Sequence, residues 1–485
     1  MQSGRINIKA HLMIDITALS DFKYKSPKEI VEKLYKESGC KVVVLDDDPT
    51  GTQTVYNVPC LTAWDEAAIS EEFNNPEPLF YILTNSRSVS STEAYSVNKL
   101  IGGRIAKISA ECLKKHILIS RSDSTLRGHF PAETDGLREG LQSPDLPCLL
   151  VPAFFPGGRI TVKDLHYVKD GEHYTEAGRT EFSRDSYFGY RNSDLKLWVE
   201  EKSSGRVKAS DVACLSLDII RNEGYEGAKE FLNSLKPGQY AVINACCQDD
   251  LDIVSHAFWL SIKEGKSFLI RSAASMVASL MGLPDRPYLS SRELTINSDK
   301  YANSDKNGGL IVIGSYVEKS TRQLNYLVNQ LLKNNISFVH LELNTEGLFD
   351  PGRAENIFSD LSRQADRQIS SGKTVLMSTS RVLMKGGNSL EALQINKTVA
   401  NTLISVVKGI AQVPRFFVAK GGITSSTMAT ECLGIKKALV LGQAMPGVPV
   451  WMSGPESNFP GLPFVIFPGN VGDESALYEL LKDLF

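Results

Sequence analysis

The sequence predicts an α/β protein made of two three-layer domains, each with a mostly parallel sheet. Strand-like and helix-like segments alternate along both halves of the chain. Several strand-like runs end directly in polar clusters, and a stretch rich in Pro, Ser, Asn and Lys separates the halves. At 485 residues the chain is also too long for one ordinary core.

The composition is typical of a globular protein with small-molecule ligands. Hydrophobic residues make up 42% and charged residues 22% of the chain. A formal charge of -3 gives no reason to expect nucleic acid as a partner. No apolar run reaches the roughly 18 residues of a membrane span, and residues 1–10 lack a signal peptide's apolar stretch. The eight scattered cysteines contain no CxxC pair, which favours reduced thiols in a cytoplasmic protein and disfavours a zinc site.

Three strands in the first 130 residues are expected to end at one edge of a parallel sheet. The apolar runs 42–45, 79–83 and 116–119 each lead into a polar cluster. Because parallel strands end together, the clusters are expected to converge on one crevice. The clusters are 46–53, 84–88 and 120–129.

The rest of the first half continues the alternation. Ser90–Glu93 resembles a capping box that opens a helix, and Pro131 suits the first turn of another. Short connections between strands and helices favour right-handed crossovers. The segment 157–207 is expected to be loop-rich or to form an inserted subdomain. Further expected elements are strands at 148–151 and 240–244 and a helix at 251–262.

The second half is expected to form a separate domain. We expect a first domain over 1–285, a linker over 286–308 and a second domain over 309–485. In the second domain, Leu324, Leu327 and Leu331 recur at helical spacing. Other expected elements are strands at 310–313, 374–377 and 416–418 and a helix over 389–410.

The aspartate cluster at the end of the first strand has two interpretations. Asp46, Asp47 and Asp48 precede a Pro-Thr-Gly turn. Adjacent carboxylates repel, so at least one is expected to have a raised pKa that suits a general base. Carboxylates also accept hydrogen bonds from hydroxyls or hold a divalent cation. The alternative is an Asp-rich turn that caps the next helix.

The cluster 120–129 combines cations, a carboxylate and hydroxyls. Arg127 is suited to fork onto a ligand carboxylate, a charge-assisted pair worth roughly 1.5 to 3 kcal/mol. Asp123 is suited to bind hydroxyls or act as a base, and Ser124 to donate to oxyanions. Arg87 is expected to be a second anion ligand. The alternative is a surface Arg–Asp pair, with His129 in a packing role.

Glycine-rich turns in the second half indicate a nucleotide site. Gly421 and Gly422 lie between a strand and a helix that begins with hydroxyl residues, the arrangement that binds phosphate. It is not the Walker motif. Related turns follow at Gly314 and over 467–473, and 444–449 offers an apolar lining for adenine. The alternative is that these residues only turn the chain. A metal role for 164–173 and a redox role for Cys246–Cys247 are not favoured.

Taken together, these motifs resemble the four-carbon acid sugar kinase family, earlier described as a domain of unknown function. Asp47–Gly51 matches its Asp-Asp-x-Thr-Gly motif, and Asp123–Gly128, followed by Glu133, matches its Asp-Ser-Thr-Leu-Arg-Gly motif. The carboxy-terminal matches are Gly314-Ser315, Gly421–Ser425 and Gly469–Gly472, with Thr321 and Gln323 only roughly in place of Thr-x-x-Gln. Two departures concern Arg121, where the family often has lysine, and Ile423, where it often has an acidic residue.

The resemblance implies an ATP-dependent kinase that phosphorylates a hydroxyl of a four-carbon acid sugar of the threonate, erythronate or 3-oxo-tetronate type. It implies Mg²⁺ as cofactor and an active site in the interdomain cleft. The expected catalytic residues are Asp47 and Asp123. The expected acid-sugar ligands are Asp48, Thr50, Gly51, Arg87, Arg121, Ser124 and Arg127. The expected nucleotide ligands are Gly314, Ser315, Gly421, Gly422, Ile423, Thr424, Ser425, Gly447, Gly469, Asn470 and Gly472.

Two other functions stay open on the sequence, and so does a homodimer. The first is a metal-dependent lyase or isomerase that uses the three aspartates as ligands. The second is a non-catalytic module that senses a nucleotide or metabolite. Binding of Mg·ATP distinguishes the kinase from the lyase, and phosphoryl transfer distinguishes it from the sensor.

Overall fold

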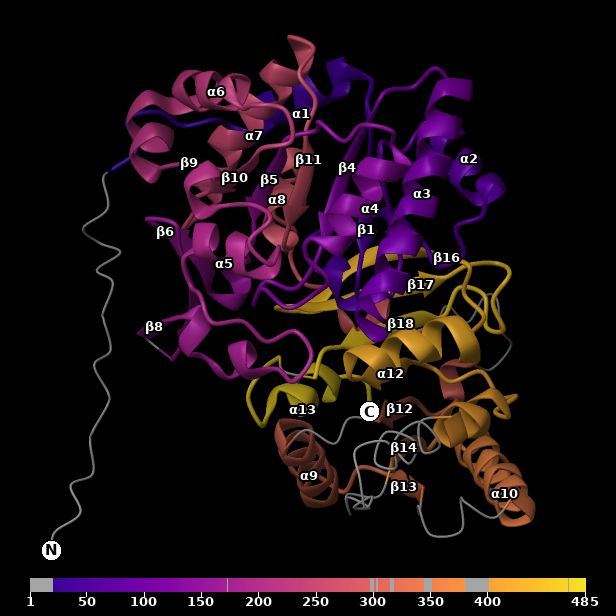
Figure 1. Ribbon diagram of the computed structural model, residues 1–485. Helices are drawn as coiled ribbons and strands as arrows, with labels where there is room; N and C mark the ends of the chain where they lie inside the picture. The colour runs from indigo at the N-terminus through magenta and orange to yellow at the C-terminus, as the bar shows by residue number, and fades with distance from the viewer. Residues whose placement is uncertain are drawn as a thin grey trace, which may run out of the picture. The chain divides into compact units, whose positions relative to one another are not determined.

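The computed structural model describes residues 21–171, 173–296, 301, 304–314, 318–343, 351–379, 401–469 and 471–485. The chain forms two compact units (Figure 1). Of the described residues, unit 1 contains 21–41 and 91–284, and unit 2 contains 42–90 and those from 285 onward. The α/β class with mostly parallel strands is confirmed.

Unit 1 is built on five parallel strands in the order β4-β11-β5-β10-β9. Their side chains are mostly buried because helices cover both faces, which is why the strands read as continuous apolar runs. The strands are β4 (His116–Arg121), β5 (Cys148–Val151), β9 (Ala213–Leu215), β10 (Tyr240–Ile243) and β11 (Leu269–Ser272).

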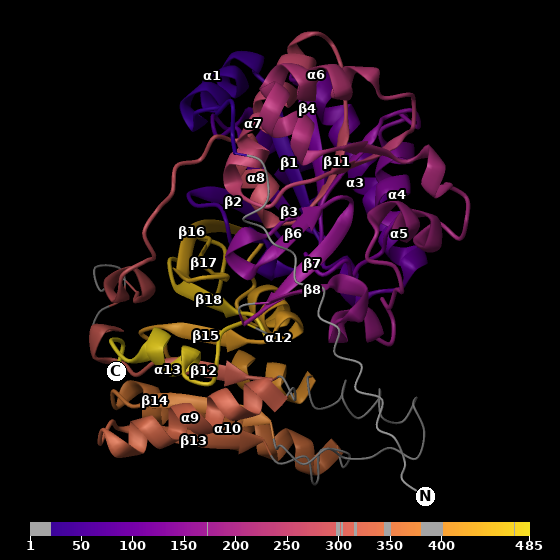
Figure 2. The same ribbon diagram turned by 90° about the vertical axis from the view of Figure 1, so that its left-hand side faces the viewer.

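Helices flank this sheet on two sides. Figure 2 shows α1, α7 and α8 on one side and α3 and α4 on the other. Helices α3 and α4 pack closely because a Cβ on Gly136 would lie 2.5 Å from the Tyr95 carbonyl oxygen. The helices are α1 (Lys28–Ser38), α3 (Ser91–Glu111), α4 (Ala132–Gly140), α6 (Gly224–Ser234), α7 (Gln248–Lys263) and α8 (Ala274–Leu280), with a π-helical turn at Ile219–Glu223.

The segment 157–207 forms an inserted subdomain, the second of the two structures expected for it. Three antiparallel strands follow one another as β6 (Arg159–Val162), β7 (Leu165–Asp170) and β8 (His173–Glu176). Helix α5 (Leu195–Lys202) follows, capped by the Asp194 carboxylate. The strands were not predicted because polar residues interrupt their apolar runs. Brief 3-10 turns lie at Phe155–Gly157, Ala177–Arg179, Glu181–Arg184 and Ala209–Asp211.

Unit 2 contains a mixed sheet. Strands β13-β14-β12-β15-β18 are parallel, β17 and β16 are antiparallel, and β2, β3 and β1 follow. The strands are β1 (Lys41–Asp46), β2 (Val58–Leu61), β3 (Leu79–Leu83), β12 (Leu310–Ile313), β13 (Phe338–Leu343), β14 (Thr374–Thr379), β15 (Phe417–Lys420), β16 (Lys437–Met445), β17 (Val448–Ser453) and β18 (Pro463–Phe467).

Figure 1 shows α9 and α10 on opposite sides of β12, β13 and β14. Leu324, Leu327 and Leu331 are buried on α9, as their spacing predicts. The expected helix over 389–410 is described only from residue 401. The helices are α2 (Glu66–Asn74), α9 (Glu318–Lys333), α10 (Pro351–Ser370), α12 (Gly422–Thr427) and α13 (Ala476–Leu481). Shorter turns lie at η2 (Pro49–Thr52), η3 (Ser86–Ser88), η9 (Ser291–Leu294), η10 (Ser304–Lys306) and the π-helical η11 (Met428–Cys432).

The compact units divide the chain differently from the domains expected along the sequence. Residues 42–90, which the sequence places in the first domain, pack in unit 2 because β2 pairs with β16. Trp451 Nε1 also donates to Thr52 Oγ1 at 2.9 Å. The described part of the expected linker 286–308 packs on unit 2 as well, since the Leu289 amide donates to the Gln443 carbonyl at 2.8 Å.

Candidate sugar and nucleotide sites

The aspartate loop of unit 2 follows directly from β1. The Asp48 carboxylate accepts from the Thr50 amide at 2.9 Å and from Thr50 Oγ1 at 2.6 Å, and so caps η2. A Cβ on Gly51 would lie 1.7 Å from Asp46 Oδ2, so only glycine fits against this buried carboxylate. The capping interpretation is therefore correct for Asp48, and its carboxylate is held in a defined place.

Arg87 binds carboxylates of the loop itself. Its Nη2 donates to Asp47 Oδ1 at 2.6 Å and its Nε to Asp47 Oδ2 at 3.3 Å, while Nη1 reaches Asp48 Oδ2 at 3.4 Å. The Asp47 side chain is only 1% exposed, so its charge is balanced by this fork. Arg87 was expected to hold a substrate anion. In the structure its guanidinium binds Asp47 and Asp48, two of the expected site aspartates, and fixes their positions.

The first two polar clusters come together as predicted. The Thr84 amide donates to the Asp46 carbonyl at 2.8 Å. This contact extends the parallel pairing of β1 with β3, in which Asp46 lies opposite Leu83. Asn85 has a positive φ of 52° and turns the chain so that Arg87 faces the aspartate loop.

The aspartate loop lies against the first glycine turn of the expected nucleotide site. A Cβ on Gly422 would lie 2.7 Å from Asp48 Oδ2. Residue 422 therefore has to be glycine for the carboxylate to keep its place. Helix α12 and turn η2 are also in contact. A carboxylate oxygen is thus positioned at the turn that the sequence assigns to phosphate.

The turns after β12, β15 and β18 meet at the carboxyl edge of the sheet. In register, Lys420 lies opposite Ile313 of β12 and Phe467 of β18. A Cβ on Gly314 would lie 2.5 Å from Thr424 Oγ1. The Gly421 amide donates to the Phe467 carbonyl at 2.8 Å. Gly421 has φ +113°, which favours glycine.

Other predicted nucleotide ligands either lie outside the described residues or make contacts that shape the turns. Ser315 and Asn470 lie outside the described residues, as does the side chain of Ile423. The Ser425 hydroxyl donates to the Ala419 carbonyl at 2.9 Å, so it stabilises the turn. Gly447, with φ +78°, turns the chain between β16 and β17 and donates its amide to Gln443 Oε1 at 2.8 Å.

The loop after β4, in unit 1, is held by an internal ion pair. Arg127 Nε donates to Asp123 Oδ2 at 2.7 Å, and Thr125 Oγ1 donates to the same oxygen. Arg127 Nη1 also lies 3.7 Å from Asp185 Oδ2. The predicted Arg–Asp pairing is correct. Its expected surface location is wrong, because the Arg127 and Asp123 side chains are only 22% and 14% exposed.

Buried groups of the inserted subdomain hold this loop from behind. His166 Nε2 donates to the Ser124 carbonyl at 2.7 Å, and the Thr161 hydroxyl binds His166 Nδ1 at 3.0 Å. Burial lowers the pKa of His166 to about 4, so the ring is neutral at pH 7. The Tyr190 hydroxyl donates to the Thr125 carbonyl at 2.7 Å, and burial, aided by the charge of Asp123, raises its pKa.

A small pocket opens in unit 1 beside the ion pair. Its polar lining includes Asp123 and Arg127 together with Arg271 and Ser272 from β11. Arg271 Nη1 donates to Glu133 Oε2 at 2.5 Å and to Ser120 Oγ at 2.7 Å. Ser272 Oγ is buried and has no hydrogen-bond partner among the described residues. The other lining residues are Ser122, Leu126, Leu150, Pro152, Leu195 and Trp198.

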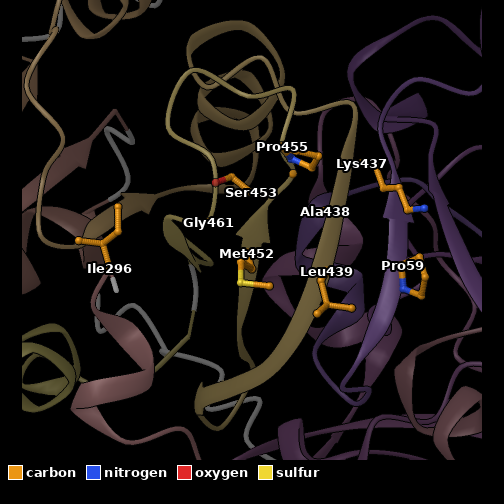
Figure 3. Close-up of a pocket in the computed structure, with 10 residues that line it drawn as sticks. Pro59, Ile296, Lys437, Ala438, Leu439, Met452, Ser453, Pro455 and Gly461 are labelled. Atoms are coloured by element: carbon orange, nitrogen blue, oxygen red, sulfur yellow. The ribbon is translucent and has the colours of Figure 1, made fainter. Parts of the chain in front are cut away.

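A wider cavity of about 570 Å³ lies elsewhere in unit 2. Figure 3 shows Leu439 of β16 and Met452 of β17 among its mainly apolar lining. Among the described residues that line it, only Lys437 is charged. None of the predicted site residues that the structure describes lines this cavity, so we do not assign the expected chemistry to it.

Two family models match the sequence. A sugar-binding N-terminal domain matches residues 42–280, and a nucleotide-binding C-terminal domain matches residues 310–477. The chain belongs to the four-carbon acid sugar kinase family. No curated protein is similar enough in sequence to match it. Among the described helices, none combines the length and apolar character needed to cross a bilayer.

Solved structures share the fold of this family member. A Salmonella typhimurium LT2 protein named "putative tRNA synthase" is 15% identical, with a TM-score of 0.65 over 92% of this chain and 99% of its own. Haemophilus influenzae HI1011, described as DUF1537, is 16% identical, with a TM-score of 0.59 over 91% of this chain and 100% of its own. These likenesses support the fold.

Three polar residues of this acid sugar kinase family member were not among the predicted ligands. Gln323 is buried, and its Nε2 donates to the Val471 and Asp473 carbonyls at 3.1 and 2.6 Å, which fixes the last glycine turn. The expected Thr-x-x-Gln motif begins one residue earlier, at Ser320.

The other two missed residues lie at strand ends. Lys420 is fully buried, and its Nζ donates to the Pro468 carbonyl at 3.2 Å. Arg271 and Ser272 end β11 in the way that the other polar clusters end their strands, so the same signal was present in Leu269–Ser272. Arg121 lies opposite Ser272 in the β4–β11 register and is buried.

Proposed function

We propose that this protein is an ATP-dependent kinase that phosphorylates a hydroxyl of a four-carbon acid sugar. The observation that carries the proposal is the contact between the aspartate loop and the nucleotide turns. A Cβ added to Gly422 would lie 2.7 Å from Asp48 Oδ2, so this carboxylate lies directly against the glycine turn. A carboxylate at a phosphate turn is useful when a metal cation joins the two.

The groups around the turns after β12, β15 and β18 fit a triphosphate with Mg²⁺. Gly314, Gly421 and Gly422 allow close approach of the backbone to phosphate oxygens, and Lys420 ends β15 beside Gly421. Asp48 would hold Mg²⁺, which typically takes one or two carboxylates together with phosphate oxygens. When bound, Mg²⁺ offsets charge that develops on the transferred phosphoryl group. Ser315, Ile423, Thr424, Ser425, Gly447, Gly469, Asn470 and Gly472 remain proposed nucleotide ligands.

The pocket of unit 1 fits a small anion that carries hydroxyl groups. Arg127 and Arg271 would hold the carboxylate, and Ser272 Oγ would bond to the ligand because it has no partner among the described residues. The small size of the pocket favours a short carbon chain. Arg121, Ser124, Thr50, Gly51 and Arg87 are proposed to support the two ligands.

Asp123 is the better candidate for the general base. It lines the unit 1 pocket, whereas Asp47 is buried under the Arg87 fork and acts as a positioning residue. A base in contact with the attacking hydroxyl contributes roughly 10²- to 10⁴-fold to the rate. The fork leaves Asp47 less available as the metal ligand that the lyase alternative requires, whereas Asp48 contacts Arg87 only through Nη1 at 3.4 Å.

The test is ADP release from Mg·ATP with a panel of four-carbon acids. We expect turnover that depends on one or more of the acids. Asp123→Asn should lower kcat by roughly 10²- to 10⁴-fold while ATP still raises the melting temperature. Asp185→Asn is the matched control, since this carboxylate meets Arg127 from outside the pocket lining and its loss should cost much less. A folded parent protein without acid-dependent turnover would refute the proposal.

A further inference from the structure

Two adjacent cysteines lie where β10 leads into α7, outside both proposed ligand sites. Cys247 is the N-cap of α7, and the Asp250 side chain closes the capping box. Both thiols are partly exposed, so small reagents can reach them. The sequence favoured simple packing for this pair.

The two sulfur atoms converge on one carboxylate. Cys246 Sγ lies 3.2 Å and Cys247 Sγ 3.4 Å from Asp250 Oδ2. The same oxygen accepts from the backbone amides of both cysteines, at 2.9 and 3.1 Å. The two sulfurs and the carboxylate oxygen all lie within 4.8 Å of one another. The side chains of adjacent residues usually point in different directions, but those of Cys246 and Cys247 both point toward Asp250.

A fixed cation stands beside the sulfurs. Arg221 Nη2 lies 2.8 Å from Cys246 Sγ and 3.9 Å from Cys247 Sγ. Its Nε donates to Asp250 Oδ1 at 2.8 Å, and its guanidinium lies 4.5 Å from the Phe22 ring centroid. The Arg221 and Asp250 side chains are only 7% and 0% exposed. Because Arg221 already neutralises Asp250, the carboxylate is a poor ligand for a metal ion.

We propose that Cys246 and Cys247 form an oxidation site that a hydroperoxide converts to a vicinal disulfide. The Cys247 thiolate attacks the peroxide, an S–O bond forms, the O–O bond breaks, and an alcohol or water leaves with a proton. Cys246 then attacks the sulfenic acid, an S–S bond forms, and the S–O oxygen leaves as water with the remaining thiol proton. Two sulfurs are each oxidised by one electron, and the peroxide is reduced by two.

The electrostatics support Cys247 as the attacking sulfur. The hydrogen bond from Cys246 lowers the pKa of Cys247, and the same bond raises the pKa of Cys246. Cys247 also lies at the positive end of the α7 dipole. Burial instead raises the pKa of Cys148 to about 11 and that of Cys432 to about 12, so those thiols should react slowly.

The test treats the full-length protein with limiting hydrogen peroxide, alkylates the remaining thiols and maps the cysteines by mass spectrometry. We expect the peptide with residues 246 and 247 to lose two hydrogens and escape alkylation before the partly exposed Cys112 reacts. Cys246→Ser should accumulate a sulfenic acid at position 247 that dimedone traps. Cys112→Ser is the matched control and should leave the yield of disulfide unchanged.

Two results would overturn the proposal. One is oxidation of Cys112 while the thiols at 246 and 247 of the parent protein are still fully alkylated. The other is a Cys246→Ser variant that gives no dimedone adduct at position 247. The first measurement needs no variant, so it does not depend on how a substituted protein folds.

Discussion

Replacing Ser272 by alanine tests the assignment of the unit 1 pocket. Ser272 Oγ is buried without a hydrogen-bond partner among the described residues, and the residue lines the pocket with Arg127 and Arg271. Its backbone carbonyl, which accepts from the Ser122 amide at 2.9 Å, is untouched by the substitution. The variant therefore removes one hydroxyl and little else.

The substitution should weaken ligand binding without lowering the free energy of unfolding. An unsatisfied buried hydroxyl costs about 1–3 kcal/mol, so its removal should leave the free energy of unfolding unchanged or raise it by about 1 kcal/mol. A hydrogen bond to the ligand is worth about 0.5–1.5 kcal/mol, so the affinity for the acid sugar should fall about 2- to 10-fold. A purely structural serine would show neither pattern.

The assay combines urea unfolding with calorimetric titration of the preferred acid. Ser255→Ala is the matched control, because its hydroxyl is bonded to Ser279 Oγ at 3.0 Å between α7 and α8. That variant should lose about 1 kcal/mol of stability and keep its affinity. If Ser272→Ala lost stability while its affinity stayed at the parent value, the assignment of the pocket would be wrong.

Three further outcomes are expected. Gly422→Ala places a Cβ 2.7 Å from Asp48 Oδ2 and should weaken ATP binding about 10-fold in a titration, as overpacking costs about 1–3 kcal/mol. Asp47→Asn breaks the fork with Arg87 and should lower the free energy of unfolding by about 2 kcal/mol, with a coupling of similar size in a double-mutant cycle. In the folded protein the pKa of His166 is about 4, below its ordinary value of 6.5. Between these two pH values the unfolded chain therefore binds more protons than the folded protein does. Stability should therefore fall by about 2 kcal/mol from about pH 7 to about pH 5.

Controls separate these effects from general damage. Gly103→Ala meets only an ordinary contact, 3.6 Å from the Gly140 carbonyl, and should leave ATP binding intact. His166→Gln should flatten the pH dependence of stability. The prediction for His166 would be contradicted if the pH dependence of stability were unchanged in His166→Gln. The prediction for Gly422 would be contradicted if Gly422→Ala bound ATP as tightly as the parent protein. A coupling energy near zero between Asp47 and Arg87 would contradict the third prediction.

Local signals account for the parts of the fold and site that the sequence revealed. Apolar runs that end in polar residues identified β1, β3 and β4, and helical spacing identified α9, because these patterns are encoded by neighbouring residues. The glycine turns at 314 and 421 were found for the same reason. The strands of the inserted subdomain mix polar and apolar residues and therefore lack such a pattern.

Contacts between distant segments were not predictable from one sequence. Nothing near Asp48 indicates Gly422, because their proximity depends on the pairing of β2 with β16 and on the packing of η2 against α12. The partners of Arg87 likewise depend on the register of β1 with β3. The sequence therefore indicated the types of groups at each site better than it indicated which groups they bind.

The most direct measurement follows the phosphorus atoms by NMR during incubation of the protein with Mg·ATP and a panel of tetronates. We expect the γ-phosphate signal to be replaced, in step with ADP formation, by the signal of a phosphate monoester that appears only with a suitable acid. Inorganic phosphate as the sole new signal, or the same spectrum with and without the acids, would contradict the assignment as a kinase.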